Sequence, residues 1–268
     1  MTRSLAPRAG LLYEKAMIAF RLCLLSGLLA VSGMAEAATP ALNDAAARAR
    51  YEKCLRTANL DPTQALNTAL EWSRNKGGAP AEHCAAAALV ELKRYPEAAT
   101  RLDQLGRAPD MGNLRPQIFD QAGNAWMLAG DADKAVASFS AALTLSANDA
   151  DLYADLARAQ AMKKSWGEAE ADLNQALSLQ PRRPDLLVLR ASARDAEGKL
   201  KDARQDVDQA LALKPLLPDG LVERGEISRH AGDIAGARRD FESAVKTGGN
   251  SEAAETARQA LEEMDASK

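Results

Sequence analysis

The stretch from Arg115 to Asn250 repeats one pattern of apolar, small and polar positions every 34 residues, four times over. Two alanine positions recur at this interval, with a large apolar residue between them and a glycine or lysine before them. In chain order the series are Gly130, Lys164, Gly198 and Gly232; Ala135, Ala169, Ala203 and Ala237; Phe139, Leu173, Val207 and Phe241; and Ala142, Ala176, Ala210 and Ala244. A fixed period of this length is typical of a solenoid, in which each unit buries its apolar face only against its neighbours.

Weaker patterns on both sides of this stretch predict more helices. Prolines at first helical positions and connectors rich in glycine and proline mark where these helices begin and end. The predicted helices span 44–59, 63–74, 81–92, 96–107 and 252–264, with irregular connectors at 75–80 and 108–115. One face of the last helix is apolar and the rest is charged, as in the polar cap that a helical array needs at its end.

Residues 1–37 have the pattern of a secretory signal peptide. Basic residues precede an uncharged apolar run of about 13 residues, and Ala35-Glu36-Ala37 supplies a small-x-small cleavage pattern. The apolar run is shorter than the ~20 residues that span a bilayer, which argues against a retained anchor. We expect cleavage near Ala37, contact with the membrane only through this transient segment, and a periplasmic or secreted chain. Met17 is an alternative start within the segment.

The composition allows a folded chain and narrows its partners. Hydrophobic residues make up 47% and charged residues 26%, so the chain is not a disordered tail. Only 4% is aromatic, and the alanine-rich remainder suits helices whose backbones approach closely. The net charge of -3 leaves no basic excess to neutralise phosphates, so we do not expect nucleic acid among the partners.

Two cysteines, Cys54 and Cys84, remain once the signal peptide is removed. An even pair in an exported protein favours a disulfide, and the alternative is two buried free thiols that pack as small hydrophobes. Resistance to thiol labelling before reduction would distinguish these two states.

Candidate chemistry is sparse. The sequence contains no GxSxG, phosphate-binding glycine loop, CxxC or HExxH motif, and its two histidines, His83 and His230, are far apart. His83 adjoins Cys84, but zinc takes about four ligands and no others gather around this pair in the sequence. We therefore expect no catalytic residue, no metal, no cofactor and no small-molecule substrate. An enzyme would have to use Cys54, Cys84 and His83.

The four regular units resemble the tetratricopeptide repeat (TPR), a 34-residue helix-turn-helix. The units in this register are 116–149, 150–183, 184–217 and 218–251. The family's large apolar fourth position is Phe119, Tyr153, Leu187 and Leu221; its small eighth position is Gly123, Ala157, Ala191 and Gly225; its twentieth and twenty-fourth positions are the series that begin with Ala135 and Phe139; and its closing proline is Pro181 and Pro215 in two units. At position seven the chain departs from the family, because Arg190 and Arg224 replace apolar residues there. We expect these two units to pack more loosely.

The resemblance implies an all-α, right-handed superhelical solenoid. Residues 38–112 would form two divergent TPR-like helical pairs, 116–251 the four regular repeats, and 252–268 a capping helix. In this register Cys54 and Cys84 lie on first helices of adjacent repeats. Their separation of 30 residues is about one helical turn short of the period, so the two side chains could meet. A disulfide there would staple the end of the solenoid that matches the family least well.

Members of the family hold extended or helical peptides in a concave groove lined by the first helices, and the resemblance implies such a groove here. The groove positions are occupied by Asp120, Gln121, Asn124, Asp155, Arg158, Asp195, Glu223, Glu226 and Arg229. Asp151, Asp185 and Asp219 also qualify by number, but each lies at a helix start, where a carboxylate caps free N–H groups. The lysine and arginine of the family's carboxylate clamp are missing. The acidic set therefore favours a neutral or basic segment, and the alternative is ordinary solvated helix faces.

The sequence thus predicts a non-enzymatic protein–protein interaction scaffold of a bacterial cell envelope, which binds a protein or peptide segment in its groove. One alternative is a structural subunit of an envelope assembly complex that uses convex or end surfaces. Substitutions at Asp155, Asp195, Glu223 and Glu226 would then leave association intact. An enzyme with an unrecognised site is the other alternative.

Overall fold

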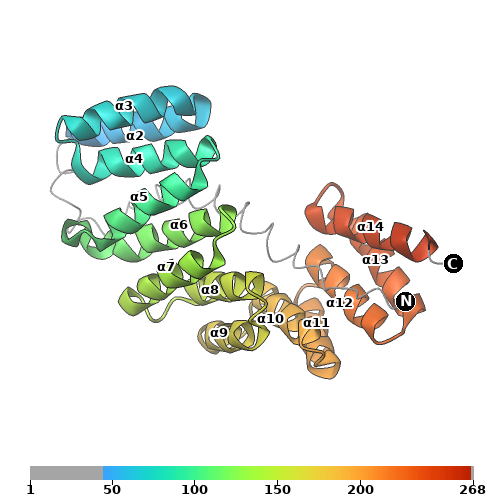
Figure 1. The fold of residues 1–268 in the computed structure, drawn as a ribbon. Helices are drawn as coiled ribbons and strands as arrows, with labels where there is room; N and C mark the ends of the chain where they lie inside the picture. The colour runs from blue at the N-terminus through green and yellow to red at the C-terminus, as the bar shows by residue number, and fades with distance from the viewer. Residues whose placement is uncertain (1–44, 267–268) are drawn as a thin grey trace, which may run out of the picture. The chain divides into compact units, whose positions relative to one another are not determined.

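The computed structural model describes residues 45–266, and over these residues the chain is helical, with no β-strand (Figure 1). The α-helices are α2 (Ala45–Leu60), α3 (Pro62–Arg74), α4 (Gly78–Glu91), α5 (Tyr95–Arg107), α6 (Arg115–Leu128), α7 (Ala132–Leu145), α8 (Ala150–Met162), α9 (Trp166–Leu179), α10 (Pro184–Ala196), α11 (Leu200–Leu213), α12 (Pro218–His230), α13 (Ile234–Gly248) and α14 (Glu252–Ala266). A 3-10 segment, η3 (Pro109–Leu114), joins α5 to α6. The expected signal peptide at 1–37 lies outside the described residues.

Helix boundaries follow local capping chemistry. The side chains of Asp61, Asp131 and Asp233 each accept a hydrogen bond from a backbone N–H in the first turn of the helix that follows. One predicted boundary was wrong, because α4 begins at Gly78 and not at Ala81. Pro80 lies within the first turn of α4, where the missing proline N–H costs nothing because first-turn N–H groups have no intrahelical partner. None of the described helices is both long and apolar enough to cross a lipid bilayer.

The described chain divides within α8 into two compact units, residues 45–159 and 160–266. In the first unit each helix from α2 to α7 packs against the next, and α2 also packs against α4. In the second unit the same holds from α9 to α14, and the first helices α10, α12 and α14 pack in succession. Each element therefore contacts only its near neighbours along the chain, which is the packing of a helical repeat solenoid.

The small eighth position of the repeat is explained by the residue it faces. A Cβ on Gly123 would lie 2.6 Å from Cε1 of Phe139, and a Cβ on Gly225 would lie 2.6 Å from Cε1 of Phe241. The two repeats that carry alanine at this position have Leu173 or Val207 in place of the phenylalanine. The volumes at the two positions thus compensate each other, as close packing of a core requires.

The series that begins with Gly130 marks the turn between the two helices of each repeat. Gly130, Gly198 and Gly232 have φ values of 76°, 78° and 83°, and Lys164 has a φ of 60°. All four residues are in the left-handed region, which glycine enters without the steric cost that a Cβ brings.

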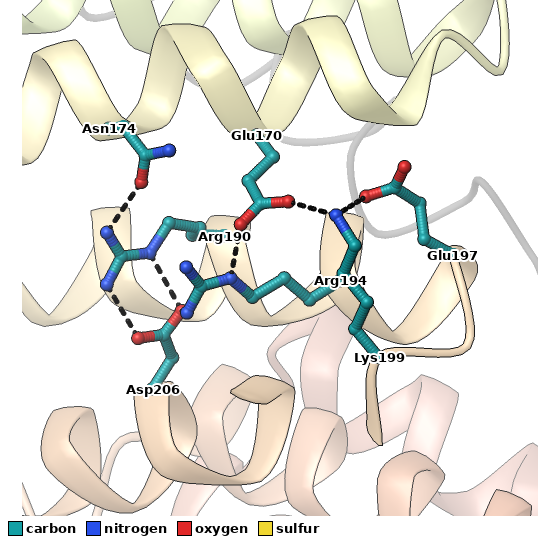
Figure 2. Close-up of polar contacts among 7 residues, drawn as sticks. All are labelled: Glu170, Asn174, Arg190, Arg194, Glu197, Lys199 and Asp206. Atoms are coloured by element: carbon teal, nitrogen blue, oxygen red, sulfur yellow. Dashed lines mark hydrogen bonds and ion pairs between the residues drawn. The ribbon is translucent and has the colours of Figure 1, made fainter. Parts of the chain in front are cut away.

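Ion pairs occupy position seven where the sequence lacks an apolar residue. Arg190 donates two hydrogen bonds to Asp206, at 2.8 and 2.7 Å, and Arg224 donates two to Asp240, at 2.9 and 2.6 Å. Figure 2 shows the first of these pairs as part of a larger network. Arginine stems and bidentate guanidinium contacts therefore connect the helices of these repeats, so the missing apolar residue does not leave them loose.

The network in Figure 2 continues beyond Arg190. Arg194 bridges Asp206 and Glu170, at 2.8 and 2.7 Å, so that α10 is linked to the second helices on both sides of it. Lys199 extends the network from Glu170 to Glu197. The Asp206 side chain is only 3% exposed, so these contacts also satisfy a buried charge.

The predicted disulfide between Cys54 and Cys84 is confirmed. It joins α2 to α4, and both cysteines are buried. The bond closes a loop of about 30 residues at the end of the first unit, where the repeat pattern is weakest.

Candidate partner-binding surface

A chain of hydrogen bonds links the first helices α2, α4 and α6. The Tyr51 hydroxyl lies 2.7 Å from Nδ1 of His83, and Nε2 of His83 lies 2.7 Å from Oε1 of Gln121. Burial lowers the pKa of His83, so its imidazole is neutral: Nε2 donates to Gln121 and Nδ1 accepts from Tyr51. Gln121, predicted to line the groove, thus holds a side chain of the preceding repeat.

Asp120 on α6, which adjoins Gln121 in the sequence, forms an acidic pair with Asp155 on α8. Burial raises the pKa of Asp120 well above its ordinary range, and repulsion from Asp155 adds to the shift. Burial also raises the pKa of Asp155, although the ion pair with Arg158 opposes this. The two carboxyl groups therefore repel each other when both are ionised.

Two polar atoms beside the acidic pair are buried without a hydrogen-bond partner. Asn124 donates from Nδ2 to the backbone oxygen and Oδ1 of Asp120, at 3.0 and 3.1 Å, while its own Oδ1 accepts nothing within the described structure. Nε of Arg158 is likewise unpaired there. A buried acceptor without a donor carries a desolvation cost.

The predicted groove residues of the second unit pair with one another. Nδ1 of His230 on α12 lies 2.8 Å from the carboxylate of Asp195 on α10, and this hydrogen bond raises the pKa of the imidazole. Arg229 forms an ion pair with Glu226 one turn earlier on α12.

The set of groove residues needs correction in three places. Asn124 and Glu223 are each only 5% exposed, and the Asp195 side chain is 8% exposed, so these three do not form open surface. Their burial depends on helix rotation and on contacts with the next repeat, which repeat numbering does not reveal. In the first unit Asn124 contacts Asp120, Gln121 contacts His83 and Arg158 contacts Asp155. In the second unit Asp195 contacts His230, Glu226 contacts Arg229, and Glu223 lies buried on α12.

The carboxylates Asp151, Asp185 and Asp219, which we excluded from the groove, lie in the first turns of α8, α10 and α12, where the helix dipole favours a negative charge. Asp149 caps α8, because its Oδ1 accepts from the backbone N–H groups of Asp151 and Leu152. Asp185 binds the guanidinium of Arg183 at 2.8 and 2.6 Å. Within residues 45–266, no group of three or more His, Cys, Asp or Glu side chains is arranged to hold a metal ion.

Comparisons with solved structures identify the fold that carries this surface. No family model matches the chain, and no curated protein matches its sequence. Among solved structures, MamA from Desulfovibrio magneticus RS-1 is similar over 65% of this chain and 97% of its own, with 19% identity and a TM-score of 0.56. YrrB, a TPR protein with an unusual peptide-binding site, is similar over 72% of this chain and 96% of its own, with 17% identity and a TM-score of 0.51. The chain therefore folds as a tetratricopeptide-repeat solenoid.

Proposed function

We propose that the chain is a protein-interaction scaffold without catalytic turnover, and that it binds a neutral or basic segment of a partner protein along its first helices. The observation that carries this proposal is the acidic pair of Asp120 and Asp155 on the first helices α6 and α8, where burial raises both pKa values although Asn124 donates to Asp120 and Arg158 pairs with Asp155. Lysine or arginine side chains of a partner would stabilise both carboxylates.

The fold is consistent with this proposal. YrrB shares the helical arrangement and has a peptide-binding site, so the fold can present one. Because each repeat contacts only its neighbours, such an array can adjust to a partner by small changes between repeats.

A cross-linked pull-down from the envelope fraction of the source cells tests the binding surface. The full chain is compared with a variant that carries Asp120→Asn, Asp155→Asn and Glu226→Gln. A matched control carries Glu168→Gln, Asp202→Asn and Glu242→Gln, which remove three exposed charges from the second helices α9, α11 and α13.

We expect one stoichiometric partner with the full chain and with the control, and loss of that partner in the first-helix variant. A partner retained by the first-helix variant would place binding on another surface, as in an assembly subunit. The absence of any partner in all three samples would contradict the scaffold function itself.

We also propose that the chain is exported and cleaved after Ala37. The disulfide between Cys54 and Cys84 supports this, because such bonds persist in oxidising compartments such as the bacterial periplasm. Mass spectrometry of the protein from fractionated cells should give a mature chain that begins at Ala38. A chain from the cytosol that still begins at Met1 or Met17 would contradict export.

A further inference from the structure

A cavity of about 480 Å³ lies in the first unit, between the second helices α5 and α7. Its apolar lining comes from Phe119 and Trp126 on α6 and from Ala137 and Ala141 on α7. The polar lining residues are Thr100, Asp103, Gln104, Arg107, Lys134 and Ser138. We call this cavity the α5–α7 pocket. Most of its lining residues lie on the second helices α5 and α7, whereas the acidic pair of Asp120 and Asp155 lies on the first helices α6 and α8.

The repeat register explains why this gap is open. Arg190 and Arg194 in the second unit stand at the same repeat positions as Ala122 and Trp126 in the first. The two arginines reach between α9 and α11 and bind Asn174, Glu170 and Asp206 there (Figure 2). Ala122 is too short to do the same. The space that arginine side chains fill in the second unit therefore stays open in the first.

The carboxylate in the pocket is already occupied by donors of the chain. Asp103 accepts from Nε1 of Trp126 through Oδ2 and from the Ser138 hydroxyl through Oδ1, both at 2.8 Å. These two bonds hold the indole ring in place as part of the pocket lining. Asp103 is thus a positioning residue for Trp126, and both of its carboxylate oxygens are engaged by donors of the chain.

The charges left for a ligand are positive. Nζ of Lys134 lies 4.2 Å from the centre of the Trp126 ring, and Lys134 also forms an ion pair with Asp131. Arg107 is exposed at the pocket and forms no ion pair with any residue of the described part of the chain. An aromatic and alanine lining next to an unpaired guanidinium is complementary to an apolar group with a negative charge beside it.

We propose that the α5–α7 pocket docks an acidic segment of a partner protein. The segment inserts one large apolar side chain, leucine or phenylalanine, between Trp126 and the two alanines, and it places a glutamate or aspartate against Arg107. A buried apolar anchor in a preformed pocket, with charge at the rim, is the usual way in which a small part of an interface supplies most of its affinity. This site is independent of the acidic first-helix surface and selects partners of opposite charge.

Short fluorescein-labelled peptides test the proposal by fluorescence anisotropy with the full chain. One series has a central Leu, Phe, Ala or Arg flanked by Glu, and a second series has the same centres flanked by Lys. We expect the Leu and Phe peptides flanked by Glu to bind about tenfold or more tightly than the Ala peptide, because the anchor side chain dominates such contacts. Equal binding of the Leu, Phe and Ala peptides within the Glu-flanked series, or no binding by any Glu-flanked peptide, would overturn the proposal.

Two variants locate the binding. Ala137→Gln with Ala141→Gln should close the pocket, and the chain tolerates these residues because Gln205 and Gln209 stand at the same repeat positions two repeats later. Arg107→Glu should reverse the charge at an exposed site. Each should weaken binding of the Leu peptide about tenfold or more, whereas Asp155→Asn on the first-helix surface should leave it unchanged. Unchanged binding in either pocket variant, with folding verified by circular dichroism, would contradict the site.

Discussion

Three aspartates at one repeat position should respond in opposite directions to the same substitution. Asp206 binds Arg190 through two hydrogen bonds and Arg194 through a third, and its side chain is 3% exposed. Within the described residues Asp240 binds only Arg224, and its side chain is 13% exposed. Asp172 makes no hydrogen bond or ion pair within the described part of the chain, and burial, with repulsion from Glu168, raises its pKa to about 6.

Asparagine keeps the shape of each side chain and removes its charge. Removing one partner of a buried ion pair costs roughly 3–5 kcal/mol. For Asp206→Asn we expect a loss of about 3 kcal/mol of stability, the low end of this range. The reason is that the Arg190 and Arg194 side chains are 18% and 17% exposed, and that Arg194 retains its ion pair with Glu170. For Asp240→Asn we expect about 1–2 kcal/mol, since two contacts are lost at a more exposed position.

Asp172→Asn should instead stabilise the chain at neutral and higher pH. Because the folded-state pKa of about 6 exceeds the ordinary value of 3.8, the proton on Asp172 favours the folded state below pH 3.8. That contribution is lost as the pH rises through 6, and above it the half-buried carboxylate is a cost. With allowance for solvent screening of a partly exposed group, we expect a gain of about 1 kcal/mol at alkaline pH and almost none in acid.

Urea unfolding followed by circular dichroism, at a pH above 6 and at a pH below 3.8, measures all three variants against the parent chain. Repeat arrays need not unfold in one step, so the order of the midpoints is the firmer readout. The expected order above pH 6 is Asp172→Asn, parent, Asp240→Asn, Asp206→Asn, from most to least stable. A destabilising Asp172→Asn, or a neutral Asp206→Asn, would refute the reasoning about these ion pairs.

Three further predictions concern the fold. Gly225→Ala should destabilise the fold by about 1–3 kcal/mol, because the added Cβ would meet Phe241. Adding Phe241→Leu should recover part of this loss in a double-mutant cycle. If the free-energy costs of the two substitutions simply add, the two positions do not compensate each other. Reducing the Cys54–Cys84 bond should lower the stability of the first unit by about 3–4 kcal/mol, because the bond closes a loop of 30 residues. Urea unfolding with and without reductant measures this loss. A Cys54→Ala/Cys84→Ala variant is the control, and its stability should not change when reductant is added. Lys164→Gly should stabilise by about 0.5 kcal/mol by relieving a left-handed backbone, whereas Gly198→Lys should destabilise; the same sign for both in thermal unfolding would argue against this cause.

The sequence predicted those features that depend on spacing alone. The 34-residue period located the helices of the regular repeats, and the positions of Cys54 and Cys84 within it predicted their bond. The start of α4 was misplaced because Pro80 reads as a helix breaker although a first turn tolerates it.

Features that depend on helix rotation and side-chain reach were harder to predict. Glu223 and Asn124 occupy groove positions by number but are buried, and Asp195 is covered by a histidine one repeat later. The arginine–aspartate pairs did leave a signal, because Arg190 and Arg224 are each followed after 16 residues by aspartate, at the same 34-residue interval. The α5–α7 pocket left no such signal, since it results from side chains that are short.

Peptide binding to the acidic first-helix surface is the most direct test of the proposed function. A labelled extended peptide with several lysines, and its counterpart with glutamates, are titrated with the full chain and with an Asp120→Asn/Asp155→Asn variant across a range of pH. We predict that the lysine peptide binds, that its affinity rises with pH as the two carboxyl groups with raised pKa ionise, and that the variant loses both the binding and its pH dependence. No binding of the lysine peptide, or binding of the lysine peptide that is unchanged in the variant, would contradict a basic partner at this surface.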